Sequence, residues 1–311
     1  MVKKKTRSGF VVAVALVACA WIGAAGQTVA PVAEPHTRVV VLGAGAPAAD
    51  PERSGPAVAI AVNHQAYLVD CGPGIVRRAA GAANNGFDEL KAAELKIVFI
   101  THLHSDHTLG YPDLIFSPCV LGRTAPLEAY GPHGLKKMTS DIEKAWEEDI
   151  HVRRVGLEQA NATGYKVNVH EIKPGIVYRD ANVTVTAFPV KHGIWKEAYG
   201  YKFETKDRKI VLSGDTAPTD EVVKACDGCD VLLHEVYNPH GNELNDPHWN
   251  QYFRTFHTSP AELGDIARRA HPRLLIAYHE VLEGLPEKDL VEQIGLAYGG
   301  NWVFAKDLGV Y

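Results

Sequence analysis

The most informative segment of this chain of 311 residues is Thr101-His102-Leu103-His104-Ser105-Asp106-His107. Three histidines and a carboxylate lie close together here, directly after the apolar run 96–100. A continuous apolar run is typical of a strand in a sheet that is covered on both faces. Zinc binds imidazole nitrogen and carboxylate oxygen, so the stretch predicts a metal site at the end of a buried strand.

The spacing within this stretch indicates two metals. At a strand end the backbone leaves its pleat, so His102 and His104 can hold one metal while Asp106 and His107 turn toward a second. Further candidates stand at the C-terminal ends of other predicted strands. They are His192 after 185–190, Asp215 after 211–214 and His279 after 276–278. Because one rim of a sheet can collect all of these side chains, we expect a single site.

The rest of the chain predicts strands that first cluster and then alternate with helices. Such an order is typical of an α/β or α+β class with covered sheets. The predicted strands are 38–42, 57–62, 66–70, 96–100, 183–186, 209–212, 231–233 and 274–277. The predicted helices are 75–83, 134–150, 219–225 and 259–270, the last beginning with a capping box at Ser259. Residues 238–256 are predicted to form a long loop.

The N-terminus has the features of a secretory signal peptide. Four basic residues precede the apolar run 10–25, which is too short for a membrane-spanning helix. We therefore expect a signal peptide at 1–26, a linker at 27–36, a catalytic domain at 37–311, and a periplasmic or secreted protein with no membrane span after processing. An uncleaved anchor and a lipoprotein with Cys19 lipidated are the alternatives.

Net charge and cysteine content limit the kinds of partner and the cellular compartment that we expect for this protein. Loss of residues 1–26 would lower the formal net charge from −5 to −9, whereas nucleic-acid binders carry basic surface. Nucleic acid is therefore an unfavoured partner, and a small ester is expected instead. Cys226 and Cys229 are expected to form a structural disulfide or remain inert thiols, and a Cys71–Cys119 bridge is left open. The oligomeric state is also open, with a homodimer as one option.

The metal motif and its companions resemble the metallo-β-lactamase superfamily over most of residues 37–311. The resemblance implies a four-layer αββα sandwich with two zinc ions. His102, His104 and His192 would hold one zinc, Asp106, His107 and His279 the other, and Asp215 would bridge them. Asp70, before Cys71-Gly72, is similar to the family's early aspartate, which steadies the ligand loop.

Three further segments resemble the ribonuclease Z-like branch of this superfamily. They are Leu42-Gly43-Ala44-Gly45 with the loop that follows, Leu233-His234-Glu235, and His257-Thr258-Ser259. The export signal and the absence of a basic Gly/Pro-rich arm between His107 and His192 count against tRNA processing. The chain therefore looks most similar to secreted aryl sulfatase-type members of the branch, a label that rests on resemblance alone.

We therefore predict an exported dinuclear zinc hydrolase that cleaves phosphate diesters or aryl sulfate esters through attack by a metal-bridging hydroxide. Asp106, His234 and His257 are the predicted catalytic side chains, and His257 is placed to protonate the leaving group. The alternatives are a lactone or carboxylic ester hydrolase, a ribonuclease Z-type endonuclease, and a non-enzymatic zinc-binding protein. Some aromatic residues are expected to line a cleft, drawn from Trp195, Tyr199, Tyr201, Trp249, Tyr252 and Phe253.

Overall fold

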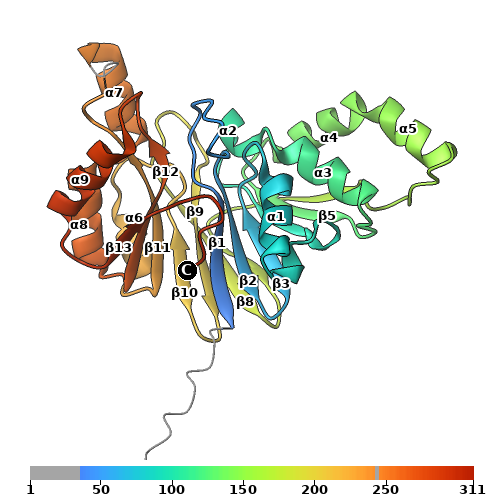
Figure 1. The fold of residues 1–311 in the computed structure, drawn as a ribbon, viewed down its shortest axis with the longest axis horizontal. Coiled ribbons are helices and arrows are strands. Elements are labelled where there is room, and N and C mark those ends of the chain that lie inside the picture. Colours follow the sequence, from blue (N-terminus) through green and yellow to red (C-terminus); the bar gives the residue numbers. More distant parts are fainter. Residues whose placement is uncertain (1–35, 242–244) are drawn as a thin grey trace, which may run out of the picture. The chain divides into compact units, whose positions relative to one another are not determined.

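Two β-sheets lie face to face in the computed structural model, which describes residues 36–241 and 245–311 (Figure 1). The predicted signal peptide and residues 27–35 of the predicted linker lie outside these ranges. In the described part the first sheet has six strands in the order β1-β2-β3-β4-β5-β6, and the second has seven in the order β13-β12-β11-β10-β9-β8-β7. Both sheets contain antiparallel and parallel neighbours.

The strands of the first sheet come from the N-terminal half of the domain. They are β1 (Thr37–Gly43), β2 (Ala57–Val62), β3 (Gln65–Val69), β4 (Ile97–Phe99), β5 (Leu127–Gly131) and β6 (Val167–Glu171). The strands of the second sheet follow. They are β7 (Gly175–Arg179), β8 (Val183–Pro189), β9 (Tyr199–Thr205), β10 (Lys209–Leu212), β11 (Val231–Tyr237), β12 (Leu274–Val281) and β13 (Trp302–Phe304).

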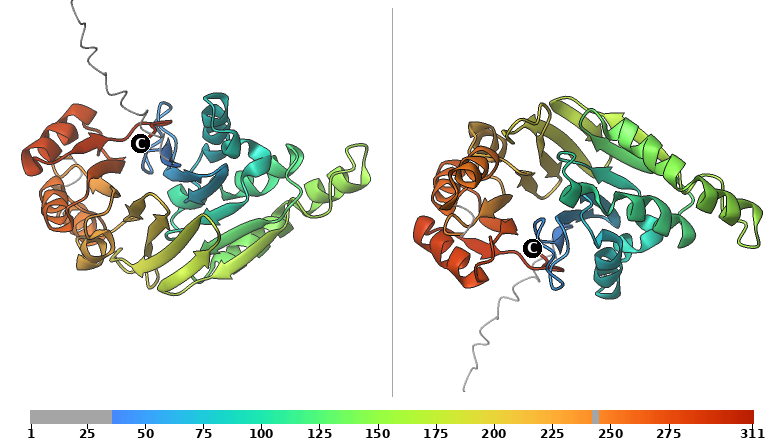
Figure 2. Two further views of the ribbon diagram at one scale, coloured as in Figure 1. Left: turned by 90° about the horizontal axis from the view of Figure 1, so that it is seen from below. Right: turned by 90° about the horizontal axis from the view of Figure 1, so that it is seen from above.

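Helices cover the outer faces of both sheets, so the predicted four-layer αββα sandwich is confirmed (Figure 2). On the first sheet lie α1 (Ile75–Asn84), α3 (Tyr111–Val120) and α4 (Leu135–Ala145). On the second lie α6 (Asp220–Cys226), α8 (Pro260–Ala270) and α9 (Glu287–Ala297). The remaining helices are α2 (Ser105–Thr108), α5 (Glu147–Val155), α7 (Pro247–Phe256) and the short 3-10 helices η1 (Asp88–Leu90) and η2 (Ala92–Glu94).

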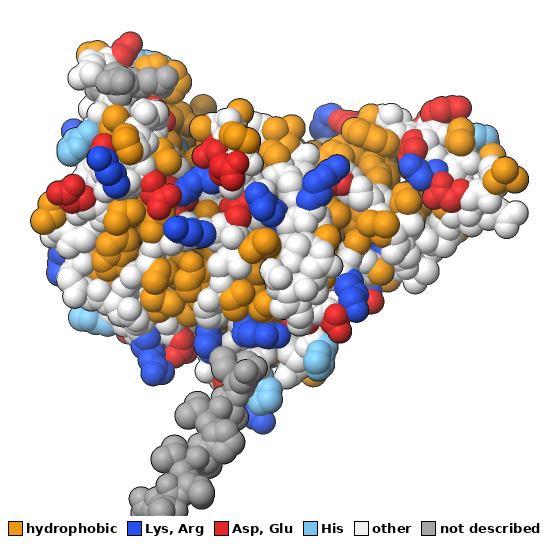
Figure 3. Space-filling model, viewed as in Figure 1, with side chains coloured by type: hydrophobic (Ala, Val, Ile, Leu, Met, Phe, Trp, Pro, Cys, Tyr) orange, Lys and Arg blue, Asp and Glu red, His pale blue; other side chains and the backbone are white. Residues whose placement is uncertain are grey.

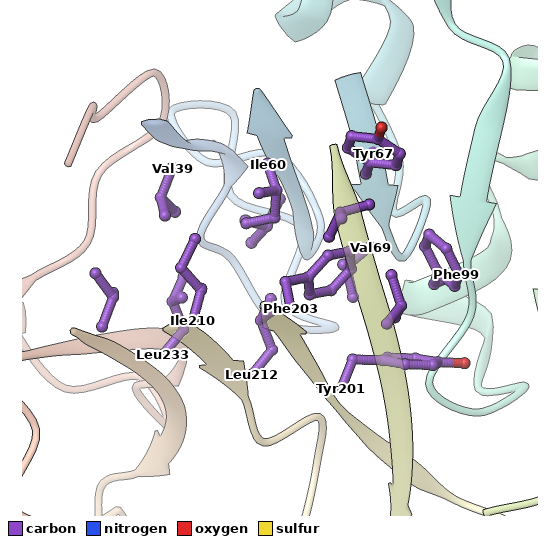
Figure 4. Packing of buried hydrophobic residues seen from close by; sticks show 14 of the residues in the cluster. Val39, Ile60, Tyr67, Val69, Phe99, Tyr201, Phe203, Ile210, Leu212 and Leu233 are labelled. Atoms are coloured by element: carbon purple, nitrogen blue, oxygen red, sulfur yellow. The ribbon is translucent and has the colours of Figure 1, made fainter. Parts of the chain in front are cut away.

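Three apolar clusters fill the three interfaces between these layers. The central one lies between the sheets, where Phe99 from β4 contacts Tyr201 and Phe203 from β9 (Figure 4). Each outer cluster joins one sheet to its helices. Burial of apolar surface on both faces explains why strands such as β4 are continuously apolar, as the sequence indicates.

Two segments differ from the sequence-based expectation. The prediction of a loop over residues 238–256 is wrong from Pro247 onward, because α7 begins there with Asp246 as its N-cap. The predicted helix 134–150 is two helices, α4 and α5, separated at Trp146, whose backbone leaves the helical region. Of the helices concerned, α5 and α7 lie at opposite ends of the domain in Figure 1, whereas α4 packs on the first sheet.

The C-terminal residues return to the first strand. Val39 and Tyr311 exchange two backbone hydrogen bonds of 2.9 Å, and Val41 pairs with Leu308 and Gly309 in the same way. Asp307 accepts hydrogen bonds from the backbone N–H groups of Ala44 and Ser54, so it fixes the loop between β1 and β2.

The structure answers two questions that the sequence left open, the pairing of the four cysteines in the described residues and the presence of a membrane-spanning helix there. Cys226 and Cys229 form a disulfide at the end of α6, in agreement with the structural alternative predicted for them. Cys71 and Cys119 are buried free thiols and are not joined. Among the described residues, every helix is too short or too polar to cross a membrane.

Candidate metal centre

All seven predicted metal ligands meet at one edge of the two sheets. They come from the segment after β4 (His102, His104), from α2 (Asp106, His107), from the turn after β8 (His192), from the turn after β10 (Asp215) and from β12 (His279). Every member except His104 is buried. The rim expected from the strand ends is therefore where these side chains lie.

The first group consists of His102, His104, His192 and Asp215. His104 Nδ1 lies 2.9 Å from His102 Nε2 and 3.0 Å from His192 Nε2. One oxygen of Asp215, Oδ2, lies 4.0 Å from both His102 Nε2 and His192 Nε2. Three imidazole nitrogens and one carboxylate oxygen thus converge on a single point.

The second group consists of Asp106, His107 and His279. Asp106 Oδ2 lies 3.1 Å from His279 Nε2 and 3.5 Å from His107 Nε2. Asp215 also reaches this group, because its Oδ1 lies 3.3 Å from His107 Nε2 and its Oδ2 lies 3.5 Å from His279 Nε2. Asp215 is therefore the side chain that lies between both groups, as the resemblance implied.

A bulge in β12 turns His279 toward the centre. Glu235 on β11 pairs with Tyr278 and Val236 pairs with Glu280, so His279 has no partner across the strands. The backbone of His279 has φ +47°, in the left-handed region that a non-glycine residue seldom occupies. A bulge re-aims a side chain in this way. β12 thus continues past His279 to Val281, whereas the sequence predicted a strand that ends before it.

Neighbouring groups orient the candidate ligands. Asp70 accepts a hydrogen bond from the Thr101 backbone N–H and lies 2.8 Å from His107 Nδ1. His192 Nδ1 lies 2.9 Å from the carbonyl oxygen of Phe256, the last residue of α7. Because a carbonyl only accepts, Nδ1 of His192 carries the proton and Nε2 keeps a free lone pair. Asp70 thus has the positioning role that the resemblance implied.

Charge and burial at the centre favour a bound cation. Burial lowers the pKa of His102 well below its usual value, so this imidazole is neutral and its Nε2 can act as a ligand. Burial opposes ionisation of Asp215, but His279 and His107 hold its pKa well below the ordinary value, so it is a carboxylate. His107 Nε2 and Asp215 Oδ1 are buried and have no hydrogen-bond partner among the described residues.

These features fit two zinc ions. Zinc binds imidazole at about 2.0–2.1 Å, so tetrahedral ligand nitrogens lie about 3.3 Å apart. The spacings of 2.9 to 4.0 Å within the first group bracket this value. A cation in each group would satisfy the two unpartnered atoms. His102, His104 and His192 would hold one ion and Asp106, His107 and His279 the other, with Asp215 shared.

A buried His–Glu pair lies beside the centre. His257 follows α7, and its ring stands 5.4 Å from that of His192 and 6.2 Å from that of His279. His257 Nδ1 lies 3.4 Å from Glu235 Oε2. The other oxygen, Glu235 Oε1, accepts hydrogen bonds from the backbone N–H groups of Thr216 and Thr258. The structure therefore brings His257 to the metal rim and adds Glu235, which was quoted in the sequence motif but not selected.

His234, the other predicted catalytic residue, points elsewhere. Leu233 faces the core between the sheets, and in a strand the next side chain faces the opposite side. His234 is fully buried and its Nδ1 lies 2.7 Å from the carbonyl oxygen of Glu235. None of its hydrogen bonds within the described ranges reaches the seven ligands. Side chains alternate between the two faces of β11. This alternation indicates that Glu235, rather than His234, faces the candidate metal centre.

An aromatic cleft of about 570 Å³ opens next to His104. Trp195 and Tyr252 line it, as predicted, together with Phe256 and Ile194. Three of the other predicted aromatics do not: Tyr199 and Tyr201 lie in the core between the sheets, and Phe253 packs from α7 against Tyr237. Trp249 lies outside the lining and contacts Tyr252 edge-on.

Comparisons with known proteins agree with this geometry. Residues 65–279 match the family model described as beta-lactamase superfamily domain. Ribonuclease Z from Mycobacterium bovis (strain BCG / Pasteur 1173P2) is 31% identical over 246 residues, which cover 78% of this chain and 85% of that protein. Ribonuclease Z from Mycobacterium tuberculosis (strain H37Rv) is 30% identical with the same coverage.

Solved structures show the same fold. The short form of human tRNase Z superimposes with a TM-score of 0.66 at 24% identity, over 88% of this chain and 98% of that one. The metallo-beta-lactamase fold protein YhfI from Bacillus subtilis gives a TM-score of 0.66 at 18% identity, over 88% and 99%. The chain therefore belongs to the metallo-β-lactamase superfamily of hydrolases, and the two mycobacterial relatives given above are named ribonuclease Z.

Proposed function

We propose that this protein is a two-zinc phosphodiester hydrolase. The observation that carries the proposal is Asp215, whose two oxygens lie within 4.0 Å of ligand nitrogens from both groups, beside the His257–Glu235 pair. Two zinc ions bound there would act as Lewis acids on the ester and supply activated water. The relatives named ribonuclease Z support a phosphate ester over a sulfate or carboxylic ester.

The His257–Glu235 pair would protonate the departing oxygen. Burial raises the pKa of Glu235 well above its ordinary value and lowers that of His257 to about 4, so the pair holds its proton on Glu235. Glu235 Oε2 and His257 Nδ1 lie 3.4 Å apart without a hydrogen bond between them. Closer approach of the two side chains on substrate binding would let Glu235 donate to Nδ1 and leave the proton of His257 on Nε2. Transfer of that proton to the leaving oxygen, while Glu235 passes its proton to Nδ1, leaves a neutral histidine and a carboxylate. The two Thr216 and Thr258 N–H groups then stabilise the carboxylate.

Asp106 has a different place in this proposal. Its Oδ2 is directed at His107 and His279, so it serves as a ligand of the second ion. A carboxylate oxygen so close to the reaction centre can also accept a proton from the attacking water. Its assignment as a catalytic side chain therefore stays a prediction alongside its role as a ligand.

The relatives favour RNA as the substrate more than the sequence did. Their name indicates a ribonuclease Z-type endonuclease, which was the alternative prediction, and it weighs against the expectation that nucleic acid is an unlikely partner. Acidic and basic side chains are interspersed on the face seen in Figure 3, which offers no single basic field to an RNA backbone. The aryl sulfatase and lactonase predictions have no support from the comparisons and remain rival activities.

A substrate panel tests the proposal. Zinc-loaded protein is offered a precursor tRNA, bis(p-nitrophenyl) phosphate, p-nitrophenyl sulfate, p-nitrophenyl acetate and a lactone. Cleavage of either phosphodiester, lost on zinc removal and restored by zinc, is the expected result. Sulfate or carboxylic ester turnover without diester turnover would replace the proposal, and tight zinc binding with no turnover at all would favour the non-enzymatic alternative.

Export forms a separate proposal. The basic residues and short apolar run before Gln27 support a cleaved signal peptide and a periplasmic or secreted protein with a formal net charge of −9. The disulfide between Cys226 and Cys229 is compatible with an oxidising compartment. An exported enzyme would meet RNA or small esters outside the cytoplasm rather than tRNA precursors inside it.

A further inference from the structure

The cleft beside His104 is lined by aromatic rings. One wall carries Tyr252 and Phe256, whose rings stack 4.4 Å apart, and Phe256 is nearly parallel to the His104 ring at 6.4 Å. Trp195 stands edge-on to His104 at 5.0 Å. The rings of Trp195 and Phe256 thus flank the candidate metal ligand His104, and Tyr252 extends the same wall of the cleft.

Ile194 extends this apolar surface into solvent. Its side chain is 92% exposed, next to Trp195 and in the lining of the cleft. A large apolar side chain that is fully exposed at the mouth of a ring-lined cleft gains free energy only when something covers it. The position next to a metal ligand indicates that the covering group belongs to the substrate.

The charges at the rim are compatible with an anionic ester. Glu197 is the one acidic side chain among the described residues that line the cleft. It forms an ion pair with Lys173 and accepts a hydrogen bond of 2.8 Å from the His133 backbone N–H. Its negative charge is therefore compensated, and Lys196 adds a positive charge to the same rim.

The glycine before Ile194 shows that the ring wall is built into the fold. A Cβ atom at Gly193 would lie 1.9 Å from the Phe256 ring, and the backbone there has φ +54°. The Gly193 N–H also donates to the Thr255 carbonyl oxygen at 3.2 Å. The Phe256 ring is thus held directly against the residue that follows the ligand His192.

We propose that this cleft binds a flat, uncharged ring carried by the ester whose phosphate lies at the metal centre. The inference rests on the proposed function, because His104 belongs to both the cleft and the first ligand group. Stacking and edge contacts with Phe256, Tyr252 and Trp195 recognise a π-face, and Ile194 covers its edge. A nucleobase and a simple aryl group share this chemistry.

Two small phosphonates separate ring binding from catalysis. Phenylphosphonate and methylphosphonate present the same oxyanion to zinc and differ only in the ring. Binding to the zinc-loaded full chain is measured by calorimetry, which needs no turnover. Phenylphosphonate is expected to bind about tenfold more tightly, the scale on which an apolar pocket discriminates. Uridine 3′-monophosphate, as a third probe, asks whether the ring is a nucleobase or a simple aryl group.

Two single-residue variants test whether the residues of the cleft cause the difference in phosphonate affinity. Ile194→Ser and Tyr252→Ala are each expected to reduce the ratio of phenylphosphonate to methylphosphonate affinity by about threefold, with methylphosphonate affinity unchanged. Leu157→Ser is the matched control, because Leu157 is also fully exposed but does not line the cleft. Zinc content and circular dichroism of each variant show that the fold is retained.

The outcomes distinguish the two proposals. Equal affinity for both phosphonates, or a ratio that both variants leave unchanged, would overturn ring binding and leave the phosphodiesterase proposal intact. Binding of neither phosphonate would overturn both, since the zinc centre would then take no phosphorus oxyanion. If uridine 3′-monophosphate gains affinity over methylphosphonate and loses it in the same variants, the ring is a nucleobase. If only phenylphosphonate does so, the substrate is a small aryl ester.

Discussion

Asp215 is the residue that lies between the two groups of candidate metal ligands. It is buried, its Oδ1 faces His107, and its Oδ2 faces His279 and the first group. Asp215→Ala is expected to lower bound zinc from two ions per chain toward one and to reduce phosphodiester turnover to near background. Metal analysis and kinetics check this. Asp265→Ala, at an exposed aspartate of α8, should change neither, and two tightly bound ions in Asp215→Ala would remove the bridging role.

His257 and Glu235 make a prediction about leaving groups. If the pair delivers a proton, His257→Ala should slow esters with poor, alkoxide-type leaving groups by about 10²- to 10⁴-fold. Nitrophenolate needs little protonation and should be affected much less. Zinc content should remain at two ions, because His257 is outside both ligand groups.

Glu235→Gln is the conservative partner of that experiment. A glutamine can still accept the Thr216 and Thr258 hydrogen bonds but cannot pass a proton to His257. It should therefore reproduce the leaving-group dependence of His257→Ala. A small, equal loss with every leaving group in both variants would mean that the pair is structural.

Six of the seven candidate ligands could be predicted from the sequence because they follow the end of a strand. His102 to His107 follow an apolar run, and His192 and Asp215 follow β8 and β10. His279 was found for a partly wrong reason, since it lies inside β12 at a bulge rather than after the strand. His234 was chosen over Glu235 because the motif alone does not say which of two neighbours faces the site, whereas the pleat of β11 does.

At the scale of elements, α7 connects the metal ligands to the cleft. Its last carbonyl orients His192, and its Phe256 ring lies against Gly193. Gly193→Ala should push this ring away and lower zinc affinity by about 10- to 100-fold, the range for loss of a group that orients a ligand. Competition with a zinc chelator measures the change.

Gly228→Ala separates crowding from backbone strain in that experiment. Gly228 also has a positive φ, +71°, but a Cβ there would meet nothing within 4 Å. Both variants carry the cost of a left-handed alanine, about 1 kcal/mol. Only Gly193→Ala should lose zinc affinity, and equal zinc affinity in the two variants would show that α7 does not hold His192.

The sequence predicted some helices and strands correctly and missed others. Strands buried on both faces, such as β4 and β10, were predicted from their apolar runs, and α8 from its capping box. By contrast, β6 and β7 are mostly exposed, so their sequences lack a continuous apolar pattern. α7 was missed although Asp246-Pro247 carries an N-cap followed by proline at the first helical position, because its polar and aromatic composition suggested a loop.

At the scale of the whole molecule, the N-terminal segment makes the next prediction. If residues 1–26 form a signal peptide, N-terminal sequencing of protein from the periplasm or medium should begin near Gln27. Replacement of Lys3, Lys4 and Lys5 by glutamate should retain the precursor in the cytoplasm, since the basic n-region would be lost. Full-length protein held in the membrane would indicate an uncleaved anchor, and a lipid on Cys19 would indicate a lipoprotein.

The return of residues 307–311 to β1 has a consequence for self-association. β1 is the outermost strand of its sheet, and an exposed strand edge is a template for pairing with another chain. Val39 and Val41 give their outward backbone groups to Leu308, Gly309 and Tyr311 instead, so the domain covers this edge with its own terminus. Deletion of residues 307–311 should make the protein aggregate at concentrations where the intact chain elutes as a single species, whereas a tag added after Tyr311 should not.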